Sequence, residues 1–96
     1  MHHEWDPAKA DSNRSKHGID FPDAIGALED PWRLEVVDDR FEYGEVRLRT
    51  LGMAVGNVLF VVTAECGDDW TRIISARKAT EHEAARYHSR DPEAWR

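Results

Sequence analysis

Residues 58–63 read Val-Leu-Phe-Val-Val-Thr, a continuous run of apolar and β-branched side chains. Such a run, bounded by turn residues, is typical of a strand that is buried on both faces of a sheet. Gly52 to Asn57 precedes it and Gly67-Asp68 follows it, and both stretches favour turns. The run therefore predicts a central strand with a neighbour on each side, joined to it by short connections.

Further stretches on both sides of this run have the composition of strands. Residues 45–51 alternate between two faces, and residues 70–76 are rich in β-branched and aromatic side chains. Residues 32–37 precede them, and residues 2–5 form a short strand at the start of the chain. Because the connections within residues 45–76 are short, we expect a twisted antiparallel sheet.

The sequence also predicts three helices, because each has recognisable end residues. Asp6-Pro7 starts the first helix, since the aspartate accepts a backbone N–H and proline fits the first helical position, and Gly18 ends it. Residues 22–29 form the second helix. Thr80 and Glu83 fit a capping box that starts the third helix, which runs to residue 89.

Together these elements predict an α+β fold, in which N-terminal helices and a C-terminal helix pack on the sheet. A chain of 96 residues suits one hydrophobic core. We therefore expect a single domain over residues 1–90 and a C-terminal tail over residues 91–96.

The sequence also indicates the cellular compartment and bears on whether a metal site is present. No signal peptide is visible, the longest apolar run is far too short to span a bilayer, and Cys66 has no second cysteine to pair with. We therefore expect a cytoplasmic protein with no membrane partner. Arg86 stands where a zinc-protease helix beginning at His82 would need its second histidine, so we expect no metal site and no cofactor.

The net charge of −6 argues against a general nucleic-acid binder, but basic residues gather locally. Lys9, Asn13, Lys16 and His17 follow one another at helical spacing and share one stripe of the first helix. Since apolar residues are scarce on this helix, the stripe is either an ordinary solvated face or a working surface.

Arginines form a second basic group on the predicted strands. Arg72 and Arg77 lie on residues 70–78, and Arg47 and Arg49 lie together on one face of a neighbouring strand. These side chains either form salt bridges with nearby carboxylates, such as Glu45, or form a clamp for phosphate, to which the planar guanidinium fork is suited.

Both groups belong to a longer pattern that resembles the BrnT toxins and is collinear from Glu4 to Tyr87. It consists of Glu4-Trp5-Asp6-Pro7, Lys9, Asn13, Lys16-His17-Gly18, Phe21, Glu29-Asp30-Pro31, Gly44-Glu45, Arg47, Gly52, Arg72-Ile73-Ile74-Ser75-Ala76-Arg77-Lys78-Ala79-Thr80, Glu83 and Tyr87. The resemblance implies a RelE-like fold and a toxin that cuts RNA and is neutralised by a BrnA-like antitoxin. It also implies that operator DNA is reached only through the antitoxin.

The resemblance carries over the motif positions Lys9, Asn13, Lys16, His17, Arg47, Arg72 and Arg77. We expect an endoribonuclease that uses the 2′-hydroxyl of RNA as nucleophile and no metal. The expected catalytic residues are Arg77, Arg47, Arg72 and His17, and the expected RNA-binding residues are Lys9, Asn13, Lys16, Arg49, Lys78 and Tyr87. Tyr87 either stacks on a base or packs in the core. The alternative function is a weak or inactive binding module that acts only by complexing its antitoxin in transcriptional co-repression.

Overall fold

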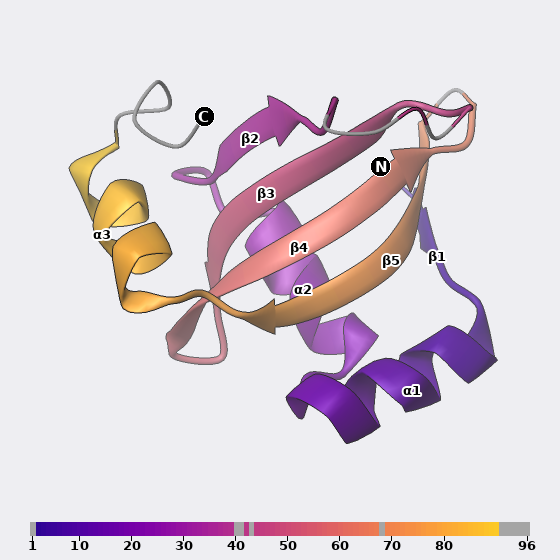
Figure 1. Cartoon of the computed structure of the whole chain (residues 1–96), viewed down its shortest axis with the longest axis horizontal. Helices are drawn as coiled ribbons and strands as arrows, with labels where there is room; N and C mark the ends of the chain where they lie inside the picture. Colours follow the sequence, from indigo (N-terminus) through magenta and orange to yellow (C-terminus); the bar gives the residue numbers. More distant parts are fainter. Residues whose placement is uncertain (1, 40–41, 43, 68, 91–96) are drawn as a thin grey trace.

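The computed structural model describes residues 2–39, 42, 44–67 and 69–90, so the expected tail at residues 91–96 lies outside the described residues. In chain order the elements are β1 (His2–Glu4), α1 (Pro7–His17), α2 (Phe21–Leu28), β2 (Leu34–Val37), β3 (Arg47–Ala54), β4 (Asn57–Glu65), β5 (Trp70–Lys78) and α3 (Glu81–Ser89) (Figure 1). The predicted α+β class and the order of elements are confirmed. No helix among the described residues is long and apolar enough to cross a membrane.

The five strands form one sheet in the order β1-β5-β4-β3-β2. β2 pairs antiparallel with β3, β3 with β4 and β4 with β5, as expected from their short connections. β1, however, pairs with β5 in parallel, with His2 opposite Trp70. The sheet is therefore mixed, because the first strand enters at the far edge and runs in the same direction as the last.

β4 lies at the centre of the sheet and is buried on both faces, as its apolar run predicts. Leu59 and Val61 pack with Phe21 in a cluster beneath α1 and α2. Phe60 and Val62 pack on the opposite face, in a cluster that includes Tyr87 of α3. Figure 1 shows α2 behind the sheet and α3 beside one end of it, so much of the face that carries Phe60 is not covered by a helix.

The ends of the helices follow the local sequence. The Asp6 side chain accepts a hydrogen bond from the Ala8 N–H, and Gly18 ends α1 in the left-handed conformation at φ 71°. The capping box of Thr80 and Glu83 at the start of α3 is present as predicted. These devices are contained within a few residues, which is why sequence reasoning located them.

The predicted turn at residues 52–57 is wrong in its extent. β3 continues to Ala54, and the turn consists of Val55 and Gly56, which both have positive φ. Gly52 lies within β3, where a Cβ atom would stand 2.1 Å from the carbonyl oxygen of Ala27 in α2. The glycine is therefore needed for close contact between helix and strand rather than for a turn.

Asn13 attaches α1 to the sheet. β1 pairs with β5 only as far as Arg72, and beyond that point the Asn13 amide bonds to the β5 backbone. Its Oδ1 accepts from the Ala76 N–H at 3.0 Å, and its Nδ2 donates to the Ala76 carbonyl at 2.8 Å and to the Ile19 carbonyl at 2.9 Å. One side chain thus satisfies the donor and the acceptor that a neighbouring strand would otherwise satisfy.

We predict that Asn13→Ala lowers the free energy of unfolding by roughly 2–4 kcal/mol, because it leaves the buried polar groups of Ala76 without their partners. Urea unfolding followed by circular dichroism measures the change. Ser12→Ala, at the exposed neighbouring position, is the matched control and should change stability by less than about 0.5 kcal/mol. Equal stability of the two variants would contradict the role assigned to Asn13.

Candidate functional site

A groove runs between α1 and β5. It has a volume of about 300 Å³ and is lined by Lys9, Ser12, Asn13, Lys16, His17, Ile74 and Ser75. The side chains of Lys9, Lys16 and His17 are exposed along it, whereas Asn13 is buried at its base with 5% of its surface accessible. The stripe predicted on the first helix therefore faces a hollow of the surface, but Asn13 serves the fold and is not free to bind a ligand.

A second groove of about 300 Å³ adjoins the first and shares Lys9 and Ile74 with it. Its lining consists of Asp6, Lys9, Arg47, Arg72, Ile73 and Ile74. Arg47 and Arg72 both lie opposite Ala64 of β4, one from each neighbouring strand, so they share one face of the sheet. Lys9 approaches from α1, and the structure therefore brings together two predicted catalytic arginines and a predicted RNA-binding lysine.

Glu45 holds the two arginines of this second groove. Its Oε2 accepts from Arg47 Nε at 3.0 Å, and its Oε1 accepts from Arg72 Nη2 at 2.8 Å. The hydrogen bond from Arg47 and the charge of Arg72 lower the pKa of Glu45 from its ordinary value, against the opposing effect of burial. Two guanidiniums that converge on one carboxylate have the geometry that also binds a phosphate.

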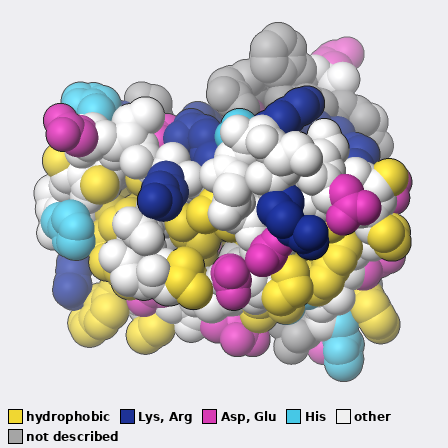
Figure 2. Space-filling model, turned by 90° about the horizontal axis from the view of Figure 1, so that it is seen from below, with side chains coloured by type: hydrophobic (Ala, Val, Ile, Leu, Met, Phe, Trp, Pro, Cys, Tyr) yellow, Lys and Arg dark blue, Asp and Glu magenta, His cyan; other side chains and the backbone are white. Residues whose placement is uncertain are grey.

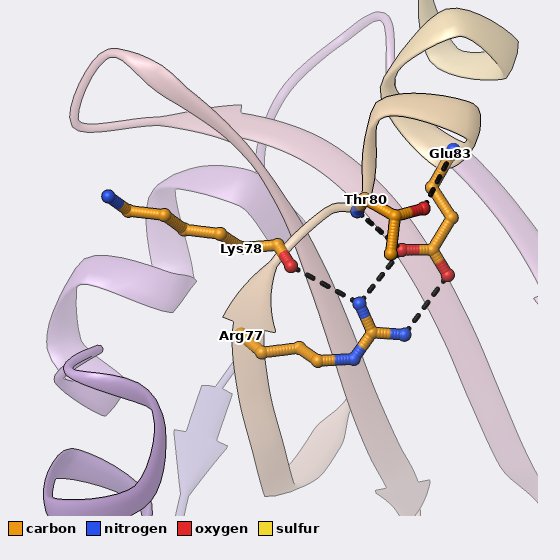
Figure 3. A network of polar contacts seen from close by, with 4 residues as sticks. All are labelled: Arg77, Lys78, Thr80 and Glu83. Atoms are coloured by element: carbon orange, nitrogen blue, oxygen red, sulfur yellow. Dashed lines mark hydrogen bonds and ion pairs between the residues drawn. The ribbon is translucent and has the colours of Figure 1, made fainter.

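Arg77 lies apart from these grooves, at the end of β5. Arg77 follows Arg72 by five positions along β5, so their Cα atoms are about 16 Å apart. Its Nη1 and Nη2 donate to the two carboxylate oxygens of Glu83 at 2.8 Å and 3.0 Å (Figure 3). Its guanidinium also lies 4.1 Å from the centroid of the Phe60 ring. Glu83 also accepts from the Thr80 N–H at 2.9 Å, so Arg77 joins β5 to the first turn of α3.

The pKa of Glu83 reflects this network. Burial raises it, but the hydrogen bonds from Arg77 and Thr80 outweigh burial and lower it below the ordinary value. Lys78 is exposed, and Figure 3 shows its side chain extending away from the guanidinium of Arg77. The geometry thus gives Arg77 a structural partner, and it places Lys78 outside both grooves.

Two other predicted RNA-binding residues are largely withdrawn from the surface. Arg49 lies opposite Val62 with its Nε 3.9 Å from Oδ1 of Asp38, and only 15% of its side chain is accessible. Tyr87 is buried in the core, and its hydroxyl donates to Asp30 Oδ2. Of the two alternatives left open for Tyr87, the structure shows packing in the core.

Asp30 is the important residue of this core that sequence reasoning did not identify. Its carboxylate accepts from the Trp32 N–H at 2.9 Å, from the Met53 N–H at 2.8 Å and from Tyr87. Burial opposes the charged form, but these hydrogen bonds, led by that of Tyr87, lower the pKa of Asp30. Burial and Asp30 raise the pKa of Tyr87 to about 12. The motif Glu29-Asp30-Pro31 belongs to the resemblance, but no role for its carboxylate follows from the sequence.

The surface around α1 is mixed in charge. Figure 2, which views the molecule from the side of α1, shows basic side chains separated by acidic and apolar ones rather than one continuous basic patch. Within the described part of the chain, no group of three or more His, Cys, Asp or Glu side chains is arranged to hold a metal ion. Positive charge at the candidate site is therefore confined to the two grooves.

Known proteins similar to this chain are ribonuclease toxins. The family model described as "Ribonuclease toxin, BrnT, of type II toxin-antitoxin system" matches residues 5–83. Among solved structures, the crystal structure of the Brucella abortus ribonuclease toxin BrnT is similar, with a TM-score of 0.62 and 26% sequence identity, over 84% of this chain and 100% of that chain. No curated protein sequence matches the chain.

We predict that Tyr87→Phe lowers the free energy of unfolding by roughly 1–3 kcal/mol at pH 7, because it removes a donor from a buried carboxylate. The folded pKa of Asp30 is depressed, so its stabilising effect is present above the unfolded value of about 3.9 and is lost as the pH falls through the folded pKa. The difference between wild type and variant should therefore shrink below about pH 4. Urea unfolding at pH 7 and at a series of lower pH values measures the difference, and equal stability of wild type and variant at pH 7 would contradict the role of the hydrogen bond from Tyr87 to Asp30.

Proposed function

The chain belongs to the family of BrnT ribonuclease toxins of type II toxin–antitoxin systems, and from this premise we propose that it is a metal-independent endoribonuclease. The observation that carries the proposal is the convergence of Arg47 and Arg72 beside Lys9 in the second groove. Fixed cations in a partly enclosed site stabilise the charge that develops on a phosphate during cleavage. RNA presents such a phosphate beside the 2′-hydroxyl that serves as the nucleophile.

The reaction needs a proton acceptor, a charge stabiliser and a proton donor. The 2′-hydroxyl loses its proton and its oxygen attacks the phosphorus, the bond from phosphorus to the 5′-oxygen breaks, and the leaving oxygen takes up a proton. Arg47 and Arg72 stabilise the phosphorane, and Lys9 and Lys16 bind the backbone on either side. His17 lines the first groove, and we assign it the proton exchange because an imidazole can both accept and donate a proton.

The remaining expected residues take other parts in this proposal. Asn13 fixes α1 against β5 and so positions Lys9 and His17. Arg77 supports the site through Glu83 and α3 rather than through the phosphate. Arg49 and Lys78 contribute positive potential at a distance from the grooves, and Tyr87 has no direct contact with RNA.

We also propose that a BrnA-like antitoxin neutralises the chain and supplies its route to operator DNA. Cleavage of RNA would then stop translation and growth whenever the antitoxin is lost. The competing function is a binding module that acts only through the antitoxin. The net charge of −6 and the occupation of both arginines by Glu45 favour that alternative.

Incubation of the purified chain with bulk RNA in EDTA tests the proposal. We expect cuts that leave 2′,3′-cyclic phosphate or 3′-phosphate ends, and Arg72→Ala should reduce the cleavage rate by roughly 100-fold. Arg77→Ala is the matched comparison and should reduce the rate by less than about 10-fold while lowering stability.

Three outcomes would contradict this assignment. A folded parent chain that cuts no RNA, even with ribosomes supplied, would favour the binding module. Equal cleavage by the parent and a folded Arg72→Ala variant would place the phosphate site elsewhere. Abolition of cleavage in a stable Arg77→Ala variant would return Arg77 to the catalytic group.

A further inference from the structure

Trp70 stands at the start of β5 with an exposed ring. Of its surface, 46% is accessible, although tryptophan has a large apolar area. It lies two residues before Arg72 on the same strand, and alternation along the strand places both side chains on one face of the sheet. Arg47 shares this face, since it lies opposite Ala64 as Arg72 does.

The indole is held in place by β1. His2 pairs with Trp70 in the sheet, and the backbone N–H of His2 donates to the Asp69 carbonyl at 2.8 Å. The two rings stack with centroids 4.8 Å apart and planes inclined by 28°. An aromatic surface that is ordered before a ligand arrives loses little conformational entropy on binding.

The spacing between Trp70 and Arg72 matches the scale of a nucleotide. Residues two apart on a strand are about 7 Å apart, and both side chains project from the same surface. In a nucleotide the base and the phosphate are likewise separated by the sugar. A phosphate held by Arg72 and Arg47 would leave its base within reach of the indole.

We propose that Trp70 is a stacking residue for a nucleobase of the RNA, at a subsite beside the phosphate held by Arg47 and Arg72. This inference rests on the proposed ribonuclease function and names one determinant of substrate binding. Stacking accepts every base, because each has an aromatic face, so Trp70 contributes affinity and register rather than recognition of one base.

Trp32 provides an internal comparison. It is more accessible than Trp70, at 57%, but it precedes β2 at the opposite edge of the sheet. The guanidinium of Arg90 lies 3.8 Å from the centroid of its ring. An exposed indole is thus not special in itself, and what distinguishes Trp70 from Trp32 is its position beside the arginine pair.

The test measures binding of a fluorescently labelled 2′-O-methyl oligoribonucleotide, which cannot be cut because its nucleophile is blocked. Fluorescence anisotropy gives the Kd for the parent chain, Trp70→Leu, Trp70→Phe and Trp32→Leu. We expect Trp70→Leu to raise the Kd by about 10-fold or more, Trp70→Phe to stay within about 3-fold of the parent, and Trp32→Leu to bind as the parent does. Trp70→Leu should leave the dependence of Kd on salt unchanged, because the indole does not contact phosphate. Arg72→Ala should reduce this dependence, because the guanidinium does.

The remaining outcomes distinguish a failure of the Trp70 subsite from a failure of the proposed ribonuclease function. Unchanged affinity in Trp70→Leu would overturn the subsite while leaving the ribonuclease proposal intact. Equal weakening by Trp70→Phe and Trp70→Leu would also overturn it, because Phe retains a stacking surface. A folded parent that neither binds this oligonucleotide nor cuts RNA would overturn the proposed function, and the subsite with it.

Discussion

The attachment of Asn13 to the backbone of Ala76 is the interaction on which the candidate site depends. α1 carries almost no apolar surface of its own, so packing alone holds it weakly against the sheet. Two hydrogen bonds between the buried Asn13 amide and the Ala76 backbone fix the distance between helix and strand, and a third, to the Ile19 carbonyl, holds the end of α1. Lys9 on the helix and Arg72 on the strand therefore face each other across a groove of defined width.

Charge balance is the second constraint. Glu45 pairs with both Arg47 and Arg72, so this one carboxylate balances only one of their two positive charges, whereas Glu83 neutralises Arg77. An approaching polyanion meets a protein of net charge −6 and is repelled at long range. In the proposed function, RNA binding therefore has to come from short-range contacts in the grooves.

Sequence reasoning succeeded where the cause was local. The central strand and the capping box of Thr80 depend on neighbouring residues, and the resemblance supplied the groove residues. It failed where partners are distant in sequence: the amide of Asn13 meets Ala76 across 63 positions, so a solvated residue and a buried one look alike in the sequence. The Val55 turn was missed because a β-branched residue at positive φ is rare.

The coverage of the β5 edge also bears on how the protein behaves at high concentration. A free strand edge presents unpaired backbone groups to any other extended chain, and this is a common route to aggregation. Here β1 covers the first part of that edge and the Asn13 amide occupies the Ala76 position beyond it. The opposite edge of the sheet is β2, a strand of four residues that exposes the carboxylate of Glu35. Edge-to-edge polymerisation is thus disfavoured at both sides of the sheet: on one side the edge consists of the three-residue β1 and the Asn13 side chain, and on the other β2 is short and carries an exposed charge.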